Sequence, residues 1–219
     1  MKEIRQRGRP RTFDRDAAID AAMLLFWSRG YDTTSLADLT AELGIAPASL
    51  YAAFGSKEQL FREAVERYRE KYGGFDPATL SAAHRARALI ATLLQGAATA
   101  YTTAGQPRGC MIISAAANCS PDSAGVERAL RDTRRTNEAH LAKRLERAVR
   151  DGELRRGTNP RALAKFVATV LQGMSIQARD GADRSALLAV ASAALTVVDA
   201  SVAGPRHARP NRRRVINDD

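Results

Sequence analysis

Residues 26–61 of this chain read FWSRGYDTTSLADLTAELGIAPASLYAAFGSKEQLF, and this stretch decides the fold. It contains two short apolar patterns, over about 35–43 and 47–54, with Gly44 between them. Each pattern predicts a short helix with one buried side, and Pro47 suits the first turn of the second helix. Two short helices joined by a glycine turn are typical of helix-turn-helix geometry, although a plain helical bundle with an accidental glycine turn shows the same pattern.

Longer amphipathic helices are expected on both sides of this motif. The first spans 15–29, where apolar residues recur at helical spacing and Asp14 and Gly30 suit its two ends. The second begins after Gly55. The inward-facing stripes of these two helices are Ile19, Met23, Phe26 and Trp27, and Leu60, Phe61, Ala64, Val65 and Tyr68.

The remaining two-thirds of the chain also have helical periodicity. Glycines and a proline at 73–77 break the pattern and mark the best internal boundary. Alanine is abundant and no alternating strand pattern is present, so the sequence predicts an all-α fold. Beyond the boundary, helices are expected over about 79–103, 123–151, 160–179 and 183–203, with a short apolar segment over 110–118.

The charge of the chain is concentrated at its two ends. The 219 residues include 34 Lys and Arg and 24 Asp and Glu, a formal net charge of +10. Residues 1–12 hold five bases and one acid, and residues 204–219 hold five bases and two acids, so the middle is nearly balanced. Two basic termini on a chain whose middle has little net charge favour a protein that contacts a polyanion through its termini.

Several function classes are disfavoured by what the sequence lacks. It has no apolar run long enough to cross a bilayer and no secretory signal, and two cysteines are too few for a disulfide framework. The three histidines lie far apart and show no ligand spacing, and neither a phosphate loop nor a nucleophile elbow is present. We therefore expect a cytoplasmic protein that is not an enzyme, with no cofactor and no metal.

The motifs of the first third resemble the TetR family of bacterial transcriptional regulators. They cover about residues 10–65 in unbroken order: Phe26-Trp27-Ser28-Arg29-Gly30-Tyr31, Thr33-Thr34-Ser35-Leu36-Ala37-Asp38-Leu39, Gly44-Ile45, Ser49-Leu50-Tyr51 and Phe54-Gly55-Ser56-Lys57-Glu58-Gln59-Leu60-Phe61. The resemblance implies an all-α homodimer with an N-terminal three-helix helix-turn-helix DNA-binding domain, followed by a helical ligand-binding and dimerisation domain. It also implies repression that is relieved when a small molecule binds.

The resemblance and the patterns together divide the chain into four parts. These are a basic flexible arm over 1–12, the DNA-binding domain over 13–72, the effector-binding and dimerisation domain over 73–203, and a disordered basic tail over 204–219.

The resemblance also implies roles for individual residues. Thr34, Ser49, Tyr51 and Lys57 match phosphate-contacting positions, and Ser35, Pro47 and Ala48 match positions that read bases. The sequence departs from the family at Ala52 and Ala53, where many members carry an aromatic residue and a histidine, so contacts from those two side chains are absent here. The residues at the base-reading positions are small and mostly apolar, which favours methyl contacts to thymine over bidentate hydrogen bonds to bases.

The basic arm contributes a second candidate DNA contact. Arg7, Arg9 and Arg11 directly precede the first helix of the DNA-binding domain. Such an arm can enter the neighbouring minor groove, where narrow A·T tracts concentrate negative potential. A solvated leader that only aids solubility is the alternative.

The effector site is sought among the central helices. Apolar and polar residues from three helices, which the resemblance places around one cavity, are the candidates: Leu94, Tyr101, Met111, Asn118, Asn137, Phe166, Val170, Met174 and Gln177. Simple core packing is the alternative for most of them. These stripes carry no charge, so we expect a neutral or weakly polar effector.

Two further features have competing interpretations. Cys110 and Cys119 are nine residues apart, which puts them on opposite faces if one helix joins them, so buried free thiols are favoured over a redox pair. The last two helices, 160–179 and 183–203, are poor in charge, which favours a four-helix interface between two copies over a monomeric core.

The sequence therefore predicts a one-component regulator that represses transcription from a palindromic double-stranded operator. It predicts a homodimer that is released by its effector and associates with the bacterial nucleoid when bound. The rival from another class is a protein that coats DNA without sequence preference.

Overall fold

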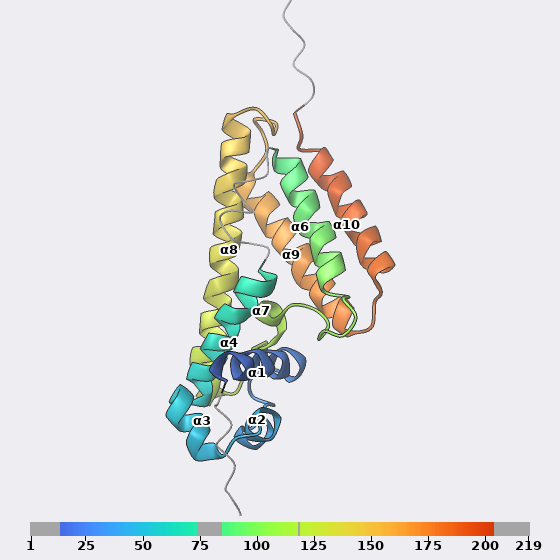
Figure 1. Cartoon of the computed structure of the whole chain (residues 1–219). Helices are drawn as coiled ribbons and strands as arrows, with labels where there is room; N and C mark the ends of the chain where they lie inside the picture. Colours follow the sequence, from blue (N-terminus) through green and yellow to red (C-terminus); the bar gives the residue numbers. More distant parts are fainter. Residues whose placement is uncertain (1–13, 74–84, 118, 204–219) are drawn as a thin grey trace, which may run out of the picture.

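The computed structural model describes residues 14–73, 85–117 and 119–203, and this part of the chain is all α-helical apart from one isolated antiparallel bridge between Leu154 and Val202. Figure 1 shows two groups of helices, one at each end of the molecule. The all-α class and the order of the two groups confirm the prediction from the sequence. The basic arm, residues 74–84 and the tail lie outside the described residues.

The first group, here called the reading head, consists of α1 to α4. These helices span Arg15–Arg29, Leu36–Leu43, Pro47–Phe54 and Lys57–Tyr72. The sequence explains their ends. The Asp14 side chain accepts a hydrogen bond from the Ala17 N–H at the start of α1, and Gly44 adopts a left-handed conformation that ends α2. The helices therefore begin and end where the capping residues predicted, to within about two residues.

A core of aromatic and aliphatic side chains holds the reading head together. The predicted inward stripes of α1 and α4 are all buried, and Leu39, Leu50 and Phe54 join them from the two short helices. Phe61 packs edge-on against Phe26, with 5.0 Å between the ring centroids. Leu36 and Leu43 are only partly buried, because the second helix is short and reaches the core mainly through Leu39.

The second group, here called the body, consists of α6 (Ala86–Ala100), α8 (Ala124–Arg150), α9 (Pro160–Arg179) and α10 (Arg184–Asp199). A short helix, α7 (Met111–Ser114), and a 3₁₀ turn, Pro121–Ser123, lie between α6 and α8. α6 packs against α10 and α9, and α8 packs against α9. The long α8 runs along one side of the body and reaches the reading head (Figure 1).

The last helix is shorter than predicted. It ends at Asp199 rather than at residue 203, and Val202 instead pairs with Leu154 in the isolated bridge. Its large apolar residues Leu187, Leu195 and Val198 are buried in the core of the body. A different stripe, with Val190 43% exposed and Val197 50% exposed, remains on its surface.

Residues 109–117 and 119–123, here called the junction segment, connect the body to the reading head. The Trp27 indole Nε1 donates a hydrogen bond to the Gly109 carbonyl at 3.2 Å, and the Tyr31 N–H donates to the Ala115 carbonyl at 2.7 Å. Met111, the first residue of α7, is fully buried and belongs to the core of the reading head. The two groups of helices therefore share a packed and hydrogen-bonded boundary.

A carboxylate adds a second connection at this boundary. Asp32 accepts hydrogen bonds from the Ser120 N–H and from the Ser123 hydroxyl. Burial alone opposes ionisation of this carboxyl group, but the hydrogen bonds from both serines outweigh it and lower the pKa of Asp32. An ionised Asp32 thus fastens the turn before α2 to the segment before α8.

Candidate nucleic-acid interface and ligand cavity

The N-terminal half of α3 forms an exposed surface at the end of the reading head. Pro47, Ala48, Ser49 and Tyr51 are exposed, and Tyr51 has 48% of its surface accessible. Leu50 is fully buried, so α3 is held by one face while the other is free. This geometry presents the residues predicted to contact DNA on the side of α3 that faces solvent.

Ser35 starts α2 at the same end of the molecule, where it forms a capping box with Asp38. The Ser35 Oγ accepts a hydrogen bond from the Asp38 N–H at 3.0 Å, and the Asp38 carboxylate accepts from the Ser35 N–H at 2.8 Å. Hydrogen bonds from Ser35, together with the nearby Arg29 guanidinium, lower the pKa of Asp38. Ser35 remains exposed, so the cap orders the N-terminus of α2 without covering it.

Thr34 does not face solvent, which corrects one predicted phosphate contact. Its side chain is fully buried, and its hydroxyl donates a hydrogen bond to the Gly30 carbonyl at 2.7 Å. The hydroxyl is used inside the turn that joins α1 to α2, so Thr34 shapes this turn and its side chain cannot reach a phosphate. Ser35, one residue later, is the exposed hydroxyl.

Lys57 begins α4, as predicted, and packs against an aromatic ring. Its ammonium lies 4.2 Å from the centroid of the Tyr31 ring. Partial burial lowers the pKa of Lys57, while the carboxylates of Asp32 and Asp38 act in the opposite direction. The ring and the carboxylates therefore hold the cation near the N-terminus of α4. Arg7, Arg9 and Arg11 lie outside the described residues.

A cavity of about 540 Å³ lies between α4, α6, α8 and α9. Two of the predicted effector residues, Tyr101 and Asn137, line it. Its apolar wall is built by residues such as Leu93, Ala97 and Leu171. Its volume is within the range of small-molecule sites in proteins.

Most of the other predicted effector residues do not line this cavity. Leu94, Met111 and Met174 are buried in the protein core. Phe166 and Val170 are partly buried against the core of the body, and Gln177 is exposed on α9. None of these six residues lines the cavity. Helical periodicity identifies an inward side but not which inward residues border a gap, so it does not predict which of them line this cavity. Asn118 lies outside the described residues.

The polar part of the wall is formed by residues that were not predicted. Tyr68 and Tyr72 come from α4, and Arg134 and Glu138 come from α8. The expectation of an uncharged wall is therefore wrong for this cavity. The spacing of Arg134, Asn137 and Glu138 at three and four residues places them on one face of α8, a signal that was present in the sequence.

Cys110 lines the cavity beside two tyrosines. Its N–H donates a hydrogen bond to the Ser175 hydroxyl at 2.8 Å, and its thiol contacts the Tyr68 and Tyr101 hydroxyls. Burial raises the pKa of Cys110 even though the hydrogen bonds oppose this effect. Cys110 and Cys119 are both free thiols, and no metal-binding cluster is found in the described ranges.

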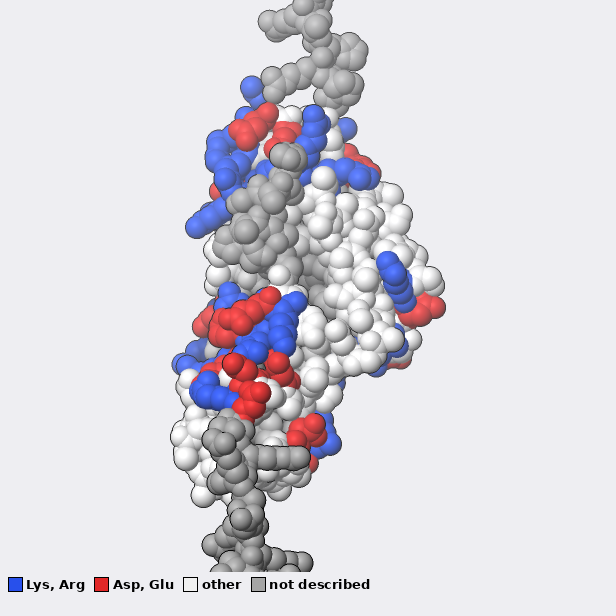
Figure 2. All heavy atoms as spheres, viewed as in Figure 1, with Lys and Arg blue, Asp and Glu red and all other residues white. Residues whose placement is uncertain are grey.

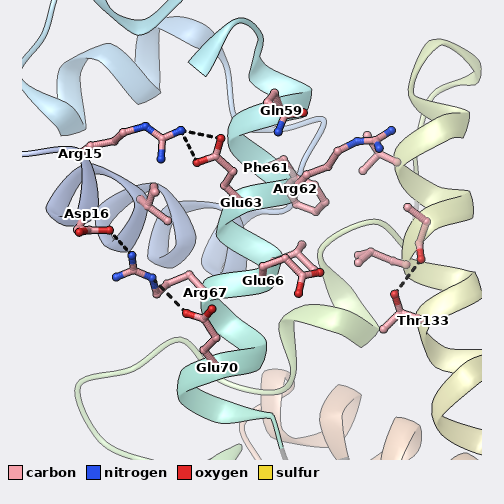
Figure 3. A pocket seen from close by; sticks show the side chains of 15 residues that line it. Arg15, Asp16, Gln59, Phe61, Arg62, Glu63, Glu66, Arg67, Glu70 and Thr133 are labelled. Carbon is pink, nitrogen blue, oxygen red and sulfur yellow. Dashed lines mark hydrogen bonds and ion pairs between the residues drawn. The ribbon is translucent and has the colours of Figure 1, made fainter. Parts of the chain in front are cut away.

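A second hollow of about 480 Å³ lies between α1, α4 and α8 and has a different character (Figure 3). Its charged side chains all take part in ion pairs. Arg15 pairs with Glu63 at 2.7 Å and Arg67 with Asp16 at 2.5 Å, whereas Arg62 and Glu66 pair with residues outside the hollow. The Asp16 hydrogen bond is the main cause of the raised pKa of Arg67. These ion pairs fasten α1 to α4, so we assign this hollow a structural role within the reading head.

Comparisons with known proteins agree with this arrangement. Residues 18–64 match the family model described as bacterial regulatory proteins, tetR family, and residues 82–194 match the tetracyclin repressor-like C-terminal domain. The chain is 36% identical over 192 residues to the HTH-type transcriptional repressor ComR of Escherichia coli (strain K12), with 87% of this chain and 91% of the relative covered. It is 33% identical over 198 residues to the repressor BdcR of the same strain, with 88% and 93% covered.

A solved structure resembles the whole fold. It is a cysteine mutant of the TetR family transcriptional regulator CifR complexed with a 26-bp double-strand operator DNA. The sequence identity is 44%, the TM-score is 0.81, and the match covers 86% of this chain and 98% of the other. In the part of this chain that is described, no helix is long and apolar enough to cross a membrane.

Proposed function

The chain belongs to the TetR family of bacterial transcriptional regulators, and we propose that it is a repressor that binds a palindromic operator as a homodimer and leaves it when a small molecule binds. The observation that carries this proposal is the exposed N-terminal half of α3, which the buried Leu50 and Phe54 hold in place. An operator lies in the bacterial cytoplasm, so we place the protein there.

We assign DNA contacts to residues at the free end of the reading head. Ser49, Tyr51 and Lys57 are proposed to contact phosphates, where hydroxyls and a cation suit the anion. Ser35, Pro47 and Ala48 are proposed to meet base edges in the major groove. The backbone of Thr34 still lies at the start of this surface, but its side chain has no such role.

The basic arm is proposed to extend this contact into the minor groove through Arg7, Arg9 and Arg11. We propose that residues 1–12 form the basic arm, that residues 13–72 form the DNA-binding domain, and that residues 73–203 bind the effector and form the dimer. The tail over 204–219 is proposed to be solvated and to take no part in operator binding.

The surface of the body supports a homodimer. Figure 2 shows that the face over α6 and α10 carries almost no charged side chains, in contrast to the reading head. Ile176 of α9 and Val190 and Val197 of α10 are large apolar residues left 43%, 43% and 50% exposed. Small neighbours such as Ala193 allow a second copy to approach closely. Burial of these side chains between two copies offers an explanation for their exposure in a single chain.

The effector is proposed to bind in the 540 Å³ cavity and to act through the junction segment. Cys110, Ile112 and Ile113 line the cavity, while Ala115 two residues later accepts the hydrogen bond of the Tyr31 N–H. A ligand that moves α7 thus also moves the attachment of the reading head. The two reading heads of a dimer fit the two operator half-sites at only one separation. A small change in that separation therefore weakens operator binding.

A selection from random duplexes with the full chain tests the proposal as a whole. We expect one palindrome to be enriched, with half-sites about one helical turn apart, and its binding to weaken when the correct small molecule is added. Equal affinity for all duplexes would refute sequence-specific repression and support a DNA-coating protein instead.

Salt dependence tests the individual contacts. Lys57→Ala is expected to reduce the slope of log affinity against log salt concentration by about 0.9, because one phosphate contact is lost. Arg156→Ala makes the same charge change at an exposed residue of the connection between α8 and α9, and is expected to leave the slope unchanged. Figure 1 shows this connection at the opposite end of the molecule from the reading head. Equal slopes for both variants would contradict the assignment of Lys57.

Deletion of residues 2–11 tests the arm in the same assay. The deletion removes three arginines and should flatten the slope further, by about 0.9 for each phosphate contact that the arm makes. An unchanged slope would show that the arm is only a solvated leader.

Light scattering tests the dimer. Val197→Asp places a charge on the apolar stripe of α10 and is expected to give the monomer mass at micromolar concentration. Leu24→Asp is the matched control, because Leu24 is 40% exposed on α1 in the reading head. A dimeric Val197→Asp variant, or a wild-type monomer, would contradict this interface.

A further inference from the structure

We propose that the effector cavity selects an amphipathic organic monocarboxylate, whose carboxylate pairs with Arg134 and whose apolar part lies between α6 and α9. This inference rests on the proposed function, because it names the ligand class of the same cavity. It replaces the neutral effector that the sequence suggested.

Arg134 is the charged residue of the cavity wall that has no carboxylate partner. Its guanidinium donates one hydrogen bond, from NH1 to the Ile112 carbonyl at 2.8 Å. Among residues 14–73, 85–117 and 119–203, no carboxylate lies within ion-pair distance of it. A guanidinium has five N–H donors, so most of them remain for a ligand.

The other charges on the wall are already paired. Glu138 pairs with Lys165 at 2.6 Å, and Glu66 pairs with Arg69 at 3.0 Å. Glu70 lies 3.7 Å from Arg67. Each of these carboxylates already has a cation beside it, so a basic ligand would gain little from them. A single negative charge beside Arg134 fits this balance.

Two amides line the same cavity as this cation. Asn137 lies three residues after Arg134 on the same face of α8, and Gln172 of α9 also lines the cavity. Neither side chain has a hydrogen-bond partner in the described part of the chain. A carboxylate has two acceptor oxygens, so it can accept from the guanidinium and from an amide N–H₂ at once.

The rest of the cavity suits an apolar body. Leu93, Ala97 and Leu171 contribute hydrocarbon, and a side chain at Gly96 would meet no atom within 4 Å of its Cβ. The small residues of α6 therefore leave room rather than filling it. The volume of about 540 Å³ admits a ligand of more than a few carbon atoms beside the carboxylate.

The sole tryptophan provides a direct reporter of occupancy. Trp27 packs against Tyr68 and Tyr72, with ring centroids 4.9 and 5.2 Å apart, and both tyrosines line the cavity. A ligand that displaces either ring changes the surroundings of the buried indole. Fluorescence thus measures binding without any need for DNA.

The experiment compares matched acids and amides on the full-length protein. Decanoate is titrated against decanamide, and 2-naphthoate against 2-naphthamide, with Trp27 fluorescence and the melting temperature as readouts. We expect at least one acid to bind on the order of tenfold more tightly than its amide, because a charge-assisted pair is formed. Acids that bind no better than their amides, or show no binding up to about 1 mM, would overturn the proposal.

Three variants locate the site. Arg134→Gln is expected to abolish the preference for the acid while amide binding stays within about twofold, and Arg134→Lys is expected to retain part of that preference. Arg135→Gln makes the same charge change at the exposed neighbour and should behave as wild type. Gly96→Leu should weaken acid and amide alike by filling the apolar part. Equal effects of Arg134→Gln and Arg135→Gln would overturn the assignment.

Operator binding is measured in the same titrations and separates this inference from the proposed function. If an acid binds but the selected operator stays bound, the ligand class stands and the proposed release fails. If a neutral compound releases the operator and no acid binds, release stands and the ligand class is overturned.

Discussion

Gly109 connects the body to the reading head at a point where a larger residue has no room. Its φ is +80°, and a Cβ atom there would lie 2.7 Å from the Ser175 carbonyl oxygen and 2.9 Å from the Ser175 Oγ. Gly105, in the same loop, has a φ of +77° but nothing within 4 Å of its Cβ position. Alanine at the two positions therefore tests strain and close approach separately.

The expected cost follows from these distances. A left-handed alanine costs about 1–2 kcal/mol at either position. At Gly109, α9 must also shift, because a contact of 2.7 Å to backbone oxygen is not tolerated, and the Ser175 hydroxyl must leave the Cys110 N–H to which it is bonded at 2.8 Å. A lost hydrogen bond contributes about 1 kcal/mol. Gly109→Ala should therefore destabilise the protein by roughly 2 kcal/mol more than Gly105→Ala, once the shift of α9 is included.

Thermal and urea unfolding of the two variants measure this difference. A gap of about 2 kcal/mol corresponds to a melting temperature roughly 4–8 °C lower for Gly109→Ala, given the size of the chain. Gly109→Ala should also weaken operator binding more, since the Gly109 carbonyl accepts the Trp27 hydrogen bond. Equal unfolding free energies for the two variants would refute the close approach of this loop to α9.

Three further predictions concern the reading head and the thiols. Ser35→Ala removes the capping box of α2 and should lower the free energy of unfolding by about 1 kcal/mol in urea titrations; an unchanged value would contradict the cap. Asp32→Asn should lower this free energy by about 1–2 kcal/mol at pH 7. The pKa of Asp32 is lower in the folded than in the unfolded protein, so its ionised form stabilises the fold. The difference in unfolding free energy between wild type and Asp32→Asn is therefore fully present above the unfolded pKa of about 3.9 and is lost as the pH falls through the folded pKa. A difference that stays constant down to pH 3 would contradict this. Partial burial raises the pKa of Cys110 and Cys119, so both thiols should react slowly with a disulfide reagent at pH 7 and faster above pH 9. Rapid reaction at pH 7 would contradict the raised pKa of the thiols.

The helices and their ends could be predicted because their causes are local. Capping residues such as Asp14 and Gly44, and apolar side chains at helical spacing, act over a few residues of chain. The exposed reading surface of α3 followed from the same pattern, since the burial of Leu50 and Phe54 leaves Pro47 and Ser49 outside.

The predictions failed where two elements meet. The resemblance implied a phosphate contact for Thr34, but its hydroxyl turns inward to the Gly30 carbonyl. The last helix was expected to continue to residue 203, but the pairing of Val202 with Leu154 ends its regular structure earlier. Both outcomes depend on partners that local propensity does not specify.

The sequence by itself determined the all-α architecture, the family and the exposed surface of α3 that we propose to face DNA, because these depend on short-range periodicity and on motifs in one continuous stretch. Only the tertiary structure decided which residues border the cavity between α4, α6, α8 and α9. Met111 and Arg134 both lie on helices near it, yet Met111 fills the core of the reading head while Arg134 borders the cavity. A cavity is the space left between four helices, so its walls, and the charge that they carry, are set by how those helices pack rather than by any one of them.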